Sequence, residues 1–337
     1  MTGAYILGCA GPALTKDEAA FFREADPWGF ILFDRNLGTA DEIRGLCSDL
    51  RDTVGRSAPI LIDQEGGRVQ RLRPPLARGW RPALDFSTAA GPNAARAMYL
   101  RYRLIAHELL GLGIDVNCAP LGDIARPDTH PVLANRCYGD RAEVVISVAR
   151  AVATGHLAGG VLPVLKHIPG HGRARVDSHL DLPRVDAAPE ALINSDFEPF
   201  AALADLPLGM TAHLVYSAFD PDQPATTSPR MIQMIRDEFA FEGLLMTDDL
   251  SMEALGGSIG ERAGRAIAAG CDAILHCNGD AREMEAVVEA AGRFTPEAAA
   301  RADRALSLRL PPSAIDIPAA EAELMALVAG GAYDRDE

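Results

Sequence analysis

The sequence predicts a (β/α)8 barrel of the TIM type, formed by a single domain, from three features of the chain. Short apolar runs recur eight times, segments with helical periodicity separate them, and polar residues follow most of the runs. A chain of 337 residues is long enough for one such barrel with insertions. We expect residues 1–310 to form the barrel and residues 311–337 to form a helical extension packed on it, ending in a mobile tail.

The apolar runs have the pattern of strands that are buried on both faces. Each run is nearly continuous in hydrophobicity, whereas a strand with one face in water alternates apolar and polar residues. Turn residues bound each run. The expected strands are residues 4–7, 29–33, 59–62, 114–117, 162–165, 208–211, 244–247 and 273–275.

The segments between the runs carry helix signals. Residues 39–51 and 94–112 have helical periodicity, and Thr39 is followed three residues later by Glu42, as in a capping box. Ser228-Pro229 is a second typical helix start. Eight strands that alternate with helices favour a closed barrel. A doubly wound open sheet is the alternative that periodicity alone does not exclude.

Polar residues cluster where the predicted strands end. In a barrel these points meet at one rim, at the C-terminal ends of the strands, where catalytic residues are expected. This convergence is the strongest argument for the barrel. The residues are Arg35, Asn36, Asp63, Asn117, Asp123, Lys166, His167, His213, Asp248, Asp249 and Asn278.

The composition limits the class of partner. Hydrophobic residues make up 48% of the chain and charged residues 23%, as in an ordinary globular protein. The net charge of −15 argues against a nucleic-acid-binding protein, because phosphates are bound through clustered Lys and Arg. We therefore expect a small-molecule ligand, no nucleic acid and no membrane partner, and a monomer or weak dimer.

The cysteines and the N-terminus favour a cytoplasmic location. The six cysteines are scattered in apolar surroundings without a C-x-x-C pair, which is typical of buried thiols in a reducing compartment. No basic region precedes the first apolar run, so a first strand is a better interpretation than a secretion signal. The Leu7-Gly8-Cys9 sequence leaves a lipoprotein cleavage site as a weak alternative.

Residues 166–179 form the densest polar motif, with three histidines, one aspartate, two glycines and a proline. His167 and His171 stand four residues apart, and this spacing places both rings on one face, as metal ligands, only within a helix. Pro169 forbids a regular helix here. Asp177 and His179 stand two residues apart, as on one side of an extended segment. The carboxylate can then orient the imidazole and stabilise its charged form, which makes a general acid/base pair.

Two adjacent carboxylates, Asp248 and Asp249, end the seventh predicted strand. A helix N-cap is the structural interpretation for Asp249. Asp248 would then point into the rim. A carboxylate nucleophile beside a proton donor can displace a group at an anomeric carbon with net retention. The imidazole of His179 can replace the usual carboxylic acid as the donor, because it titrates near neutral pH.

Residues 62–71 suggest a loop that grips sugar hydroxyls. Asp63 can accept hydrogen bonds from two hydroxyls, and Arg71 and Lys166 can donate. An ordinary tight turn with a surface ion pair is the alternative.

These three motifs together resemble glycoside hydrolase family 3, in particular its bacterial single-domain β-N-acetylglucosaminidases of peptidoglycan recycling. The resemblance runs from Gly29 to Asn278, and the segment 166–179 is specific to that branch. Ile168 stands where the family usually has an aromatic residue, and Cys137 stands where Ser is more familiar.

The resemblance implies roles for individual residues. It implies that Asp248 is the nucleophile, and that Asp177 and His179 form the acid/base pair. It also implies a mobile loop around this pair, a substrate with terminal β-linked N-acetylglucosamine, a cytoplasmic muropeptide bearing 1,6-anhydro-N-acetylmuramic acid, and no cofactor or metal. The implied sugar-binding residues are Asp63, Arg71, Arg136, Lys166, His167 and His213.

Three other functions fit the same residues. Phosphate in place of water could resolve the glycosyl-enzyme, which would make the protein an N-acetylglucosaminide phosphorylase. A catalytically silent amino-sugar-binding protein would bind without turnover. A metal-dependent barrel hydrolase would lose activity with chelators.

Overall fold

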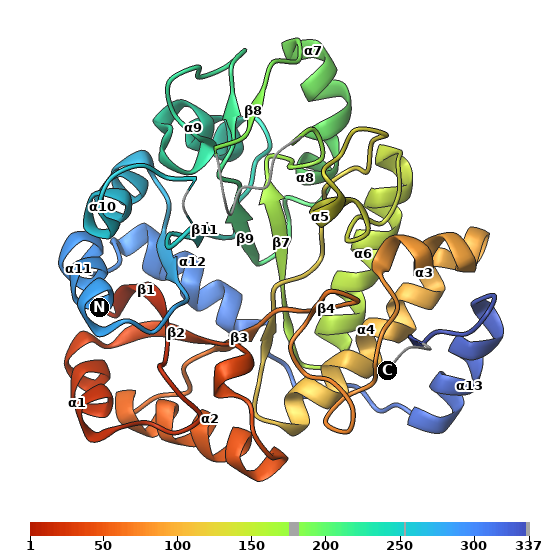
Figure 1. Ribbon diagram of the computed structural model, residues 1–337, viewed down its shortest axis with the longest axis horizontal. Coiled ribbons are helices and arrows are strands. Elements are labelled where there is room, and N and C mark those ends of the chain that lie inside the picture. The colour runs from red at the N-terminus through yellow and green to blue at the C-terminus, as the bar shows by residue number, and fades with distance from the viewer. Residues whose placement is uncertain (175–181, 253, 335–337) are drawn as a thin grey trace.

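The computed structural model describes residues 1–174, 182–252 and 254–334. Its centre is a closed barrel of eight parallel strands, which helices surround (Figure 1). The strands follow their chain order around the barrel, and β1 closes it against β12, where Tyr5 pairs with Ile274. The strands are β1 (Gly3–Gly8), β2 (Pro27–Leu32), β3 (Ile60–Ile62), β6 (Val116–Asn117), β7 (Leu162–Ile168), β9 (Leu208–Thr211), β11 (Leu244–Asp249) and β12 (Ala273–His276).

The closed barrel confirms the predicted fold, and the open-sheet alternative is wrong. All eight predicted strands are present, but four of them continue past the predicted C-terminal ends: β1 and β12 by one residue, β11 by two and β7 by three. Strand β7 extends to Ile168, which pairs with Thr211, and β11 extends to Asp249, which pairs with Leu275. The prediction ended each strand where the apolar run ended, whereas backbone pairing continues into the polar rim.

Side chains alternate between the barrel interior and the helix layer. Ile6, Ile31 and Leu61 belong to one buried cluster, and their neighbours Leu7 and Phe30 belong to another. Layers of branched side chains fill a barrel of this size, so its interior is a packed core. Ala298, Ala302 and Ala305 join the interior cluster, so their helix closes the end of the barrel where the strands begin.

The predicted helix starts are confirmed. At α2 (Ala40–Val54), Thr39 Oγ1 accepts from the backbone N–H of Glu42, and the Glu42 carboxylate accepts from that of Thr39. Ser228 caps α9 (Pro229–Asp237). The other α-helices are α1 (Lys16–Ala25), α3 (Ala83–Ala90), α4 (Ala94–Gly111), α5 (Pro131–Ala134), α6 (Ala142–Ala158), α7 (Pro189–Ala191), α8 (Glu198–Ala202), α10 (Ile259–Ala269), α11 (Ala281–Ala291), α12 (Pro296–Ser307) and α13 (Ile317–Leu327). Short strands outside the barrel are β4 (Gln64–Gly66), β5 (Val69–Gln70), β8 (Arg184–Val185) and β10 (Val215–Tyr216).

The C-terminal extension packs on the outside of the barrel, where α13 lies against α4 (Figure 1). The residues after α13 are described through Asp334, and they contact the loop before α3. The mobility of the tail stays a prediction. The Tyr333 ring lies 5.2 Å from the Trp80 ring, and the Asp334 N–H donates to the Gly79 carbonyl at 2.9 Å. Hydrophobic contact with a buried tryptophan therefore holds this segment.

All six cysteines lie in the part of the chain that the structure describes. All six cysteines are buried and unpaired, which confirms the prediction of buried thiols. Across the described segments, no helix has both the length and the apolar character needed to cross a bilayer.

Asn117 was expected among the rim residues, but it is fully buried beneath the β3–β4 segment. Its side-chain amide donates to the Gln64 carbonyl at 3.0 Å and to His156 Nε2 at 2.9 Å. His156 accepts this bond in its neutral form, and burial lowers the pKa of His156 to about 3. The Asn117–His156 pair therefore supports the β3–β4 segment, which carries Asp63.

We expect the free energy of unfolding to fall with pH below about 6.5, partly because of His156. Unfolded chains protonate histidine near pH 6.5, and the folded protein resists protonation down to about pH 3. The stability due to this group is complete above the unfolded pKa and is lost as the pH falls, by up to about 1.4 kcal/mol per pH unit. Denaturant unfolding from pH 7 to 4.5 measures it: His156→Gln should flatten the slope, and the exposed His107→Gln should not. Equal slopes for both variants and wild type would contradict this prediction.

Candidate active site

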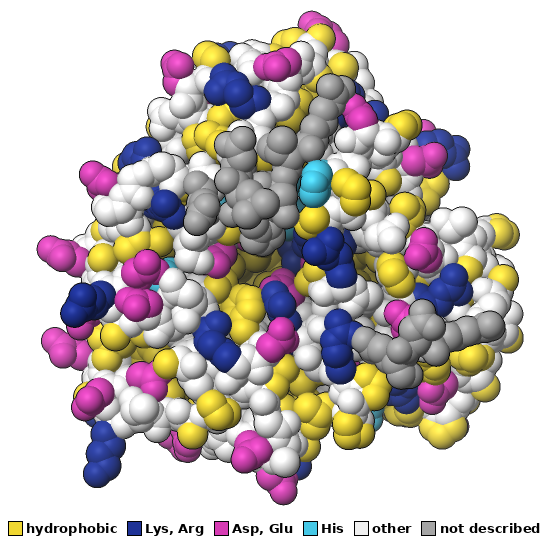
Figure 2. All heavy atoms as spheres, viewed as in Figure 1, with side chains coloured by type: hydrophobic (Ala, Val, Ile, Leu, Met, Phe, Trp, Pro, Cys, Tyr) yellow, Lys and Arg dark blue, Asp and Glu magenta, His cyan; other side chains and the backbone are white. Residues whose placement is uncertain are grey.

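A cavity opens at the C-terminal ends of the barrel strands. Figure 2 shows it as a hollow near the middle of this face, with charged and hydrophobic side chains around it. Its empty volume, open mouth included, is ≈ 850 Å³. Its lining includes Ile31, Phe33, Asp63, Val69, Arg71, His130, Val132, Leu133, Arg136, Lys166, His167, His171, Met210, Asp248, Asp249, Met252, Leu275 and Cys277.

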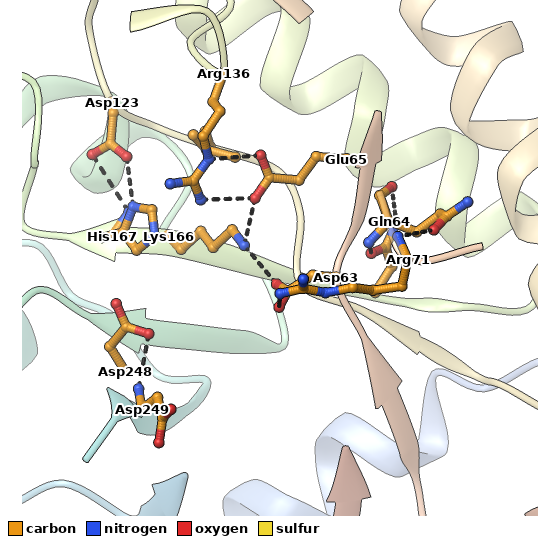
Figure 3. Close-up of polar contacts among 12 residues, drawn as sticks. Asp63, Gln64, Glu65, Arg71, Asp123, Arg136, Lys166, His167, Asp248 and Asp249 are labelled. Carbon is orange, nitrogen blue, oxygen red and sulfur yellow. Dashed lines mark hydrogen bonds and ion pairs between the residues drawn. The ribbon is translucent and has the colours of Figure 1, made fainter. Parts of the chain in front are cut away.

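Charged side chains from β3–β4, β7 and the segment after α5 meet on one side of the cavity (Figure 3). Lys166 Nζ lies 3.0 Å from Asp63 Oδ1 and 2.7 Å from Glu65 Oε1. Arg136 donates two hydrogen bonds to the Glu65 carboxylate, from Nη2 to Oε1 at 2.8 Å and from Nε to Oε2 at 2.9 Å. Arg71 Nη2 lies 3.4 Å from Asp63 Oδ2. The rim of the barrel thus joins residues that are about a hundred positions apart.

These groups are ionised despite their burial. Burial alone would raise the pKa of Asp63, but Lys166 and Arg71 outweigh it and hold that pKa below its ordinary value. Burial would lower the pKa of Lys166, but Asp63 and Glu65 raise it. The Lys166 side chain is only 2% exposed, so the interpretation as a surface ion pair is wrong. The cluster offers fixed charged donors and acceptors, which suit a polyhydroxylated ligand.

His167 extends from β7 into the cavity and is oriented by a carboxylate behind it. Asp123, which is completely buried, lies 2.7 Å from His167 Nδ1. Its other oxygen accepts from the backbone N–H of His171 at 2.6 Å. Because Nδ1 is engaged by Asp123, the other ring nitrogen, Nε2, is the one available to a ligand.

Asp248 lies at the end of β11 and lines the cavity (Figure 3). Its Oδ1 accepts from the backbone N–H of Asp249 at 2.8 Å. Burial would raise its pKa, but His167, His213 and this hydrogen bond lower it below the ordinary value. The side chain is therefore an ionised carboxylate that faces the space where a ligand would bind.

Asp249 was interpreted as a possible helix N-cap, and that interpretation is wrong. No described helix starts there, because α10 begins ten residues later with Ser258 as its cap. Asp249 Oδ1 accepts from the backbone N–H groups of Ser251 at 3.0 Å and Cys277 at 3.2 Å, and Oδ2 accepts from Ser251 Oγ at 2.6 Å. Asp249 therefore closes a tight loop and ties β11 to the end of β12.

His213 was predicted to line the site, but the structure does not bring it into the cavity. The side chain is fully buried, with Nε2 donating to the Asp249 carbonyl at 3.1 Å and Nδ1 2.7 Å from Thr226 Oγ1. Burial lowers the pKa of His213. The ring supports the backbone of β11 beside Asp248 and leaves no nitrogen for a ligand.

His171 also lines the cavity, beside His167. The two rings are 5.5 Å apart and inclined at 65°, and the chain turns after Ile168, as the proline predicted. Burial lowers the pKa of His171 to about 4, and His167 adds to the effect. In the described segments, no group of three or more His, Cys, Asp or Glu side chains is placed to hold a metal ion.

Asp177 and His179 lie outside the described residues. Among the described residues of this motif, Lys166, His167 and His171 line the cavity. The acid/base role of the pair stays a prediction.

The remaining rim residues have structural roles. Arg35 donates to the carbonyl oxygens of Cys9 and Cys277, and Asn36 donates to those of Cys9 and Gly11. These bonds tie the ends of β1, β2 and β12 together. Asn278 accepts from the Asp280 N–H before α11.

Glu65 and Asp123 were given no role in the site from the sequence. Asp123 was expected only as one of the polar residues at the rim, and Glu65 only as part of the loop 62–71. Their partners, however, are far along the chain: Glu65 contacts Arg136 and Lys166, and Asp123 contacts His167. A buried carboxylate needs such partners, and a single sequence does not show which cations supply them.

A closed (β/α)8 barrel with an ionised aspartate and a set of fixed charged donors in its rim cavity defines a barrel enzyme for a small polar substrate. Residues 14–308 match the description "Glycosyl hydrolase family 3 N terminal domain". The chain belongs to glycosyl hydrolase family 3 and is a glycoside hydrolase, as the resemblance predicted.

Two relatives named beta-hexosaminidase and one solved structure align with most of the chain. A beta-hexosaminidase from Alkalilimnicola ehrlichii is 38% identical over 286 residues, which cover 82% of this chain and 81% of that protein. One from Pseudomonas aeruginosa is 36% identical over 282 residues, covering 82% and 83%. The crystal structure of native NagZ from Neisseria gonorrhoeae superposes with a TM-score of 0.86 at 27% identity, over 97% of this chain and 98% of that one.

Proposed function

We propose that this glycoside hydrolase is a retaining β-N-acetylglucosaminidase. The observation that carries the proposal is Asp248, an ionised carboxylate that faces a cavity whose lining also includes Asp63 and Lys166. The beta-hexosaminidase relatives support the activity. A crystal structure of NagZ from Neisseria gonorrhoeae in complex with N-trifluoroacetyl-D-glucosamine, 28% identical with a TM-score of 0.85 over 97% of this chain and 98% of that one, supports an N-acylated amino sugar as the ligand.

The reaction takes two displacements at the anomeric carbon. In the first, an Asp248 oxygen forms a bond to that carbon, the bond to the glycosidic oxygen breaks, and His179 gives its proton to the leaving oxygen. In the second, His179 takes a proton from water, whose oxygen attacks the same carbon and frees the Asp248 carboxylate. Two inversions retain the β configuration. Asp177 orients the imidazole and stabilises its charge.

The charged cluster binds the non-reducing sugar. Asp63 accepts hydrogen bonds from sugar hydroxyls, while Arg71, Arg136, Lys166 and His167 donate. His213 supports β11 in place of the ligand contact that the resemblance implied. No cofactor or metal takes part in these steps.

The proposed natural substrate is the muropeptide disaccharide in which N-acetylglucosamine is β-linked to 1,6-anhydro-N-acetylmuramic acid, cleaved in the cytoplasm. This part of the proposal rests on the family resemblance of the segments 166–179 and 243–252.

Turnover of 4-nitrophenyl β-N-acetylglucosaminide, followed by proton NMR of the first sugar released, tests the proposal. We expect hydrolysis to the β-anomer, with no effect of a chelator and little turnover of the matching β-glucoside. Release of the α-anomer first would contradict retention. Sugar 1-phosphate formed in phosphate buffer would identify a phosphorylase, binding without turnover a sugar-binding protein, and loss of activity with a chelator a metal-dependent hydrolase.

A further inference from the structure

Glu65 is a buried carboxylate that does not line the cavity, although it contacts two residues that do. Its side chain is only 2% exposed, and unlike Lys166 it is not among the residues that line the cavity. We infer that Glu65 is a positioning residue that holds Lys166 and Arg136 as one fixed pair of donors to the sugar. This inference rests on the proposed sugar-binding role of that pair.

The contacts of Glu65 fix both cations at once. Oε1 is shared between Lys166 Nζ, at 2.7 Å, and Arg136 Nη2, at 2.8 Å, while Oε2 accepts from Arg136 Nε at 2.9 Å. The fork takes two of the five N–H donors of the guanidinium. Figure 3 shows the remaining terminal nitrogen of Arg136 pointing away from Glu65.

The backbone of Glu65 is itself held from behind. Its carbonyl accepts from Tyr102 Oη at 3.1 Å and from Arg101, a fully buried side chain, at 2.5 Å. The next residue, Gly66, has φ of +104°, and a Cβ there would lie 1.8 Å from Arg101 Nη2. The chain is therefore pressed against Arg101, which leaves Glu65 little freedom to move away from its partners.

The negative charge is needed as well as the shape. Burial would raise the pKa of Glu65, but Arg136 and Lys166 outweigh it and hold the carboxyl ionised. In Glu65→Gln, the amide offers one acceptor and one donor where two acceptors are needed. One cation would then face a donor, and the two positive charges would repel each other without a shared counter-charge.

The experiment compares Glu65→Gln with Glu108→Gln, using KM and kcat for the aryl N-acetylglucosaminide and thermal unfolding. Glu108 is a matched control, because it is also a largely buried glutamate paired with an arginine, Arg78, but it lies outside the cavity. We expect Glu65→Gln to raise KM about 10- to 100-fold with kcat changed far less, since lost ground-state binding appears in KM. Glu108→Gln should lower the melting temperature and leave KM within about 2-fold.

A folded Glu65→Gln protein with the KM of the wild type would overturn the inference, and so would a fall in kcat alone. If Glu65→Gln does not fold, Glu65→Asp replaces it, because the shorter side chain keeps the charge but does not reach both cations. Its KM should also rise, and an unchanged KM would refute the inference. If the wild type itself has no activity, the proposed function fails separately, and a crystal structure of the variant with Lys166 and Arg136 in their original positions would then refute the role of Glu65.

Discussion

An Asp248→Asn protein is expected to hydrolyse β-N-acetylglucosaminides at least about 10⁴-fold more slowly than the wild type. The amide is nearly isosteric, so it can still occupy the end of β11, but a neutral amide is too weak a nucleophile to form the glycosyl-enzyme. The loss should appear in kcat and in kcat/KM, because the bond to the anomeric carbon forms only during reaction. Initial rates with an aryl glycoside of purified, folded protein provide the measurement.

The adjacent carboxylate supplies the control. The oxygens of Asp249 are occupied by Ser251 and by the Cys277 N–H, so this side chain shapes the loop. Asp249→Asn should therefore lower the melting temperature and reduce kcat/KM by less than about 10-fold. The reverse ranking, with Asp249→Asn inactive and Asp248→Asn active, would show that Asp249 and not Asp248 is the nucleophile.

The second large effect is expected for His179→Ala, and it should depend on the leaving group. A general acid contributes about 10²- to 10⁴-fold when the leaving oxygen is basic, as in a sugar aglycone. An activated aryl oxygen, such as 2,4-dinitrophenolate, leaves without a proton, so kcat/KM should fall much less with it. A series of aryl glycosides of increasing leaving-group pKa measures this, and parallel losses across the series would remove His179 from the acid role.

His130→Ala is the matched control for the leaving-group series. His130 also lines the cavity, but its Nδ1 accepts from the backbone N–H of Val132 and caps α5. Its replacement should change kcat/KM by a similar factor for every aryl leaving group. Asp177→Asn should resemble His179→Ala in its dependence on the leaving group, with a smaller loss, because the imidazole remains.

The barrel could be predicted because its signal is local. Each buried strand is a short apolar run, and each helix start carries its own cap, as at Thr39 and Ser228. The strand ends were less accurate at β7 and β11, where polar residues such as Lys166 and Asp248 still take part in the barrel. Hydrophobicity falls at the rim, whereas the backbone pairing between the strands continues into it.

The cavity residues were predictable in part, because the C-terminal ends of the strands all meet at one rim. Asp63, Lys166 and Asp248, which follow or end strands, lie there together with Arg71 from the loop 62–71. Arg136 lies there too, but only the family resemblance assigned it. His213 also follows a strand, but its ring turns back to the Asp249 carbonyl, and strand position alone does not give that direction.

The supporting carboxylates could not be assigned from one sequence. Glu65 and Asp123 act through pairings that join residues some 40 to 100 positions apart, and Asn117 was misplaced for the same reason. Burial of these polar side chains is tolerated only because the fold supplies their partners. The sequence shows the residue types, whereas the three-dimensional arrangement shows which of them meet.

Covalent trapping gives the most direct view of the central reaction step. The protein would be incubated with a 2-acetamido-2-deoxy-5-fluoro-glycosyl fluoride, digested, and its peptides mapped by mass spectrometry. We expect one glycosyl group on the carboxylate of Asp248, and none in Asp248→Asn. A label on any other residue, or rapid turnover of the reagent with no covalent adduct at any time, would contradict the account.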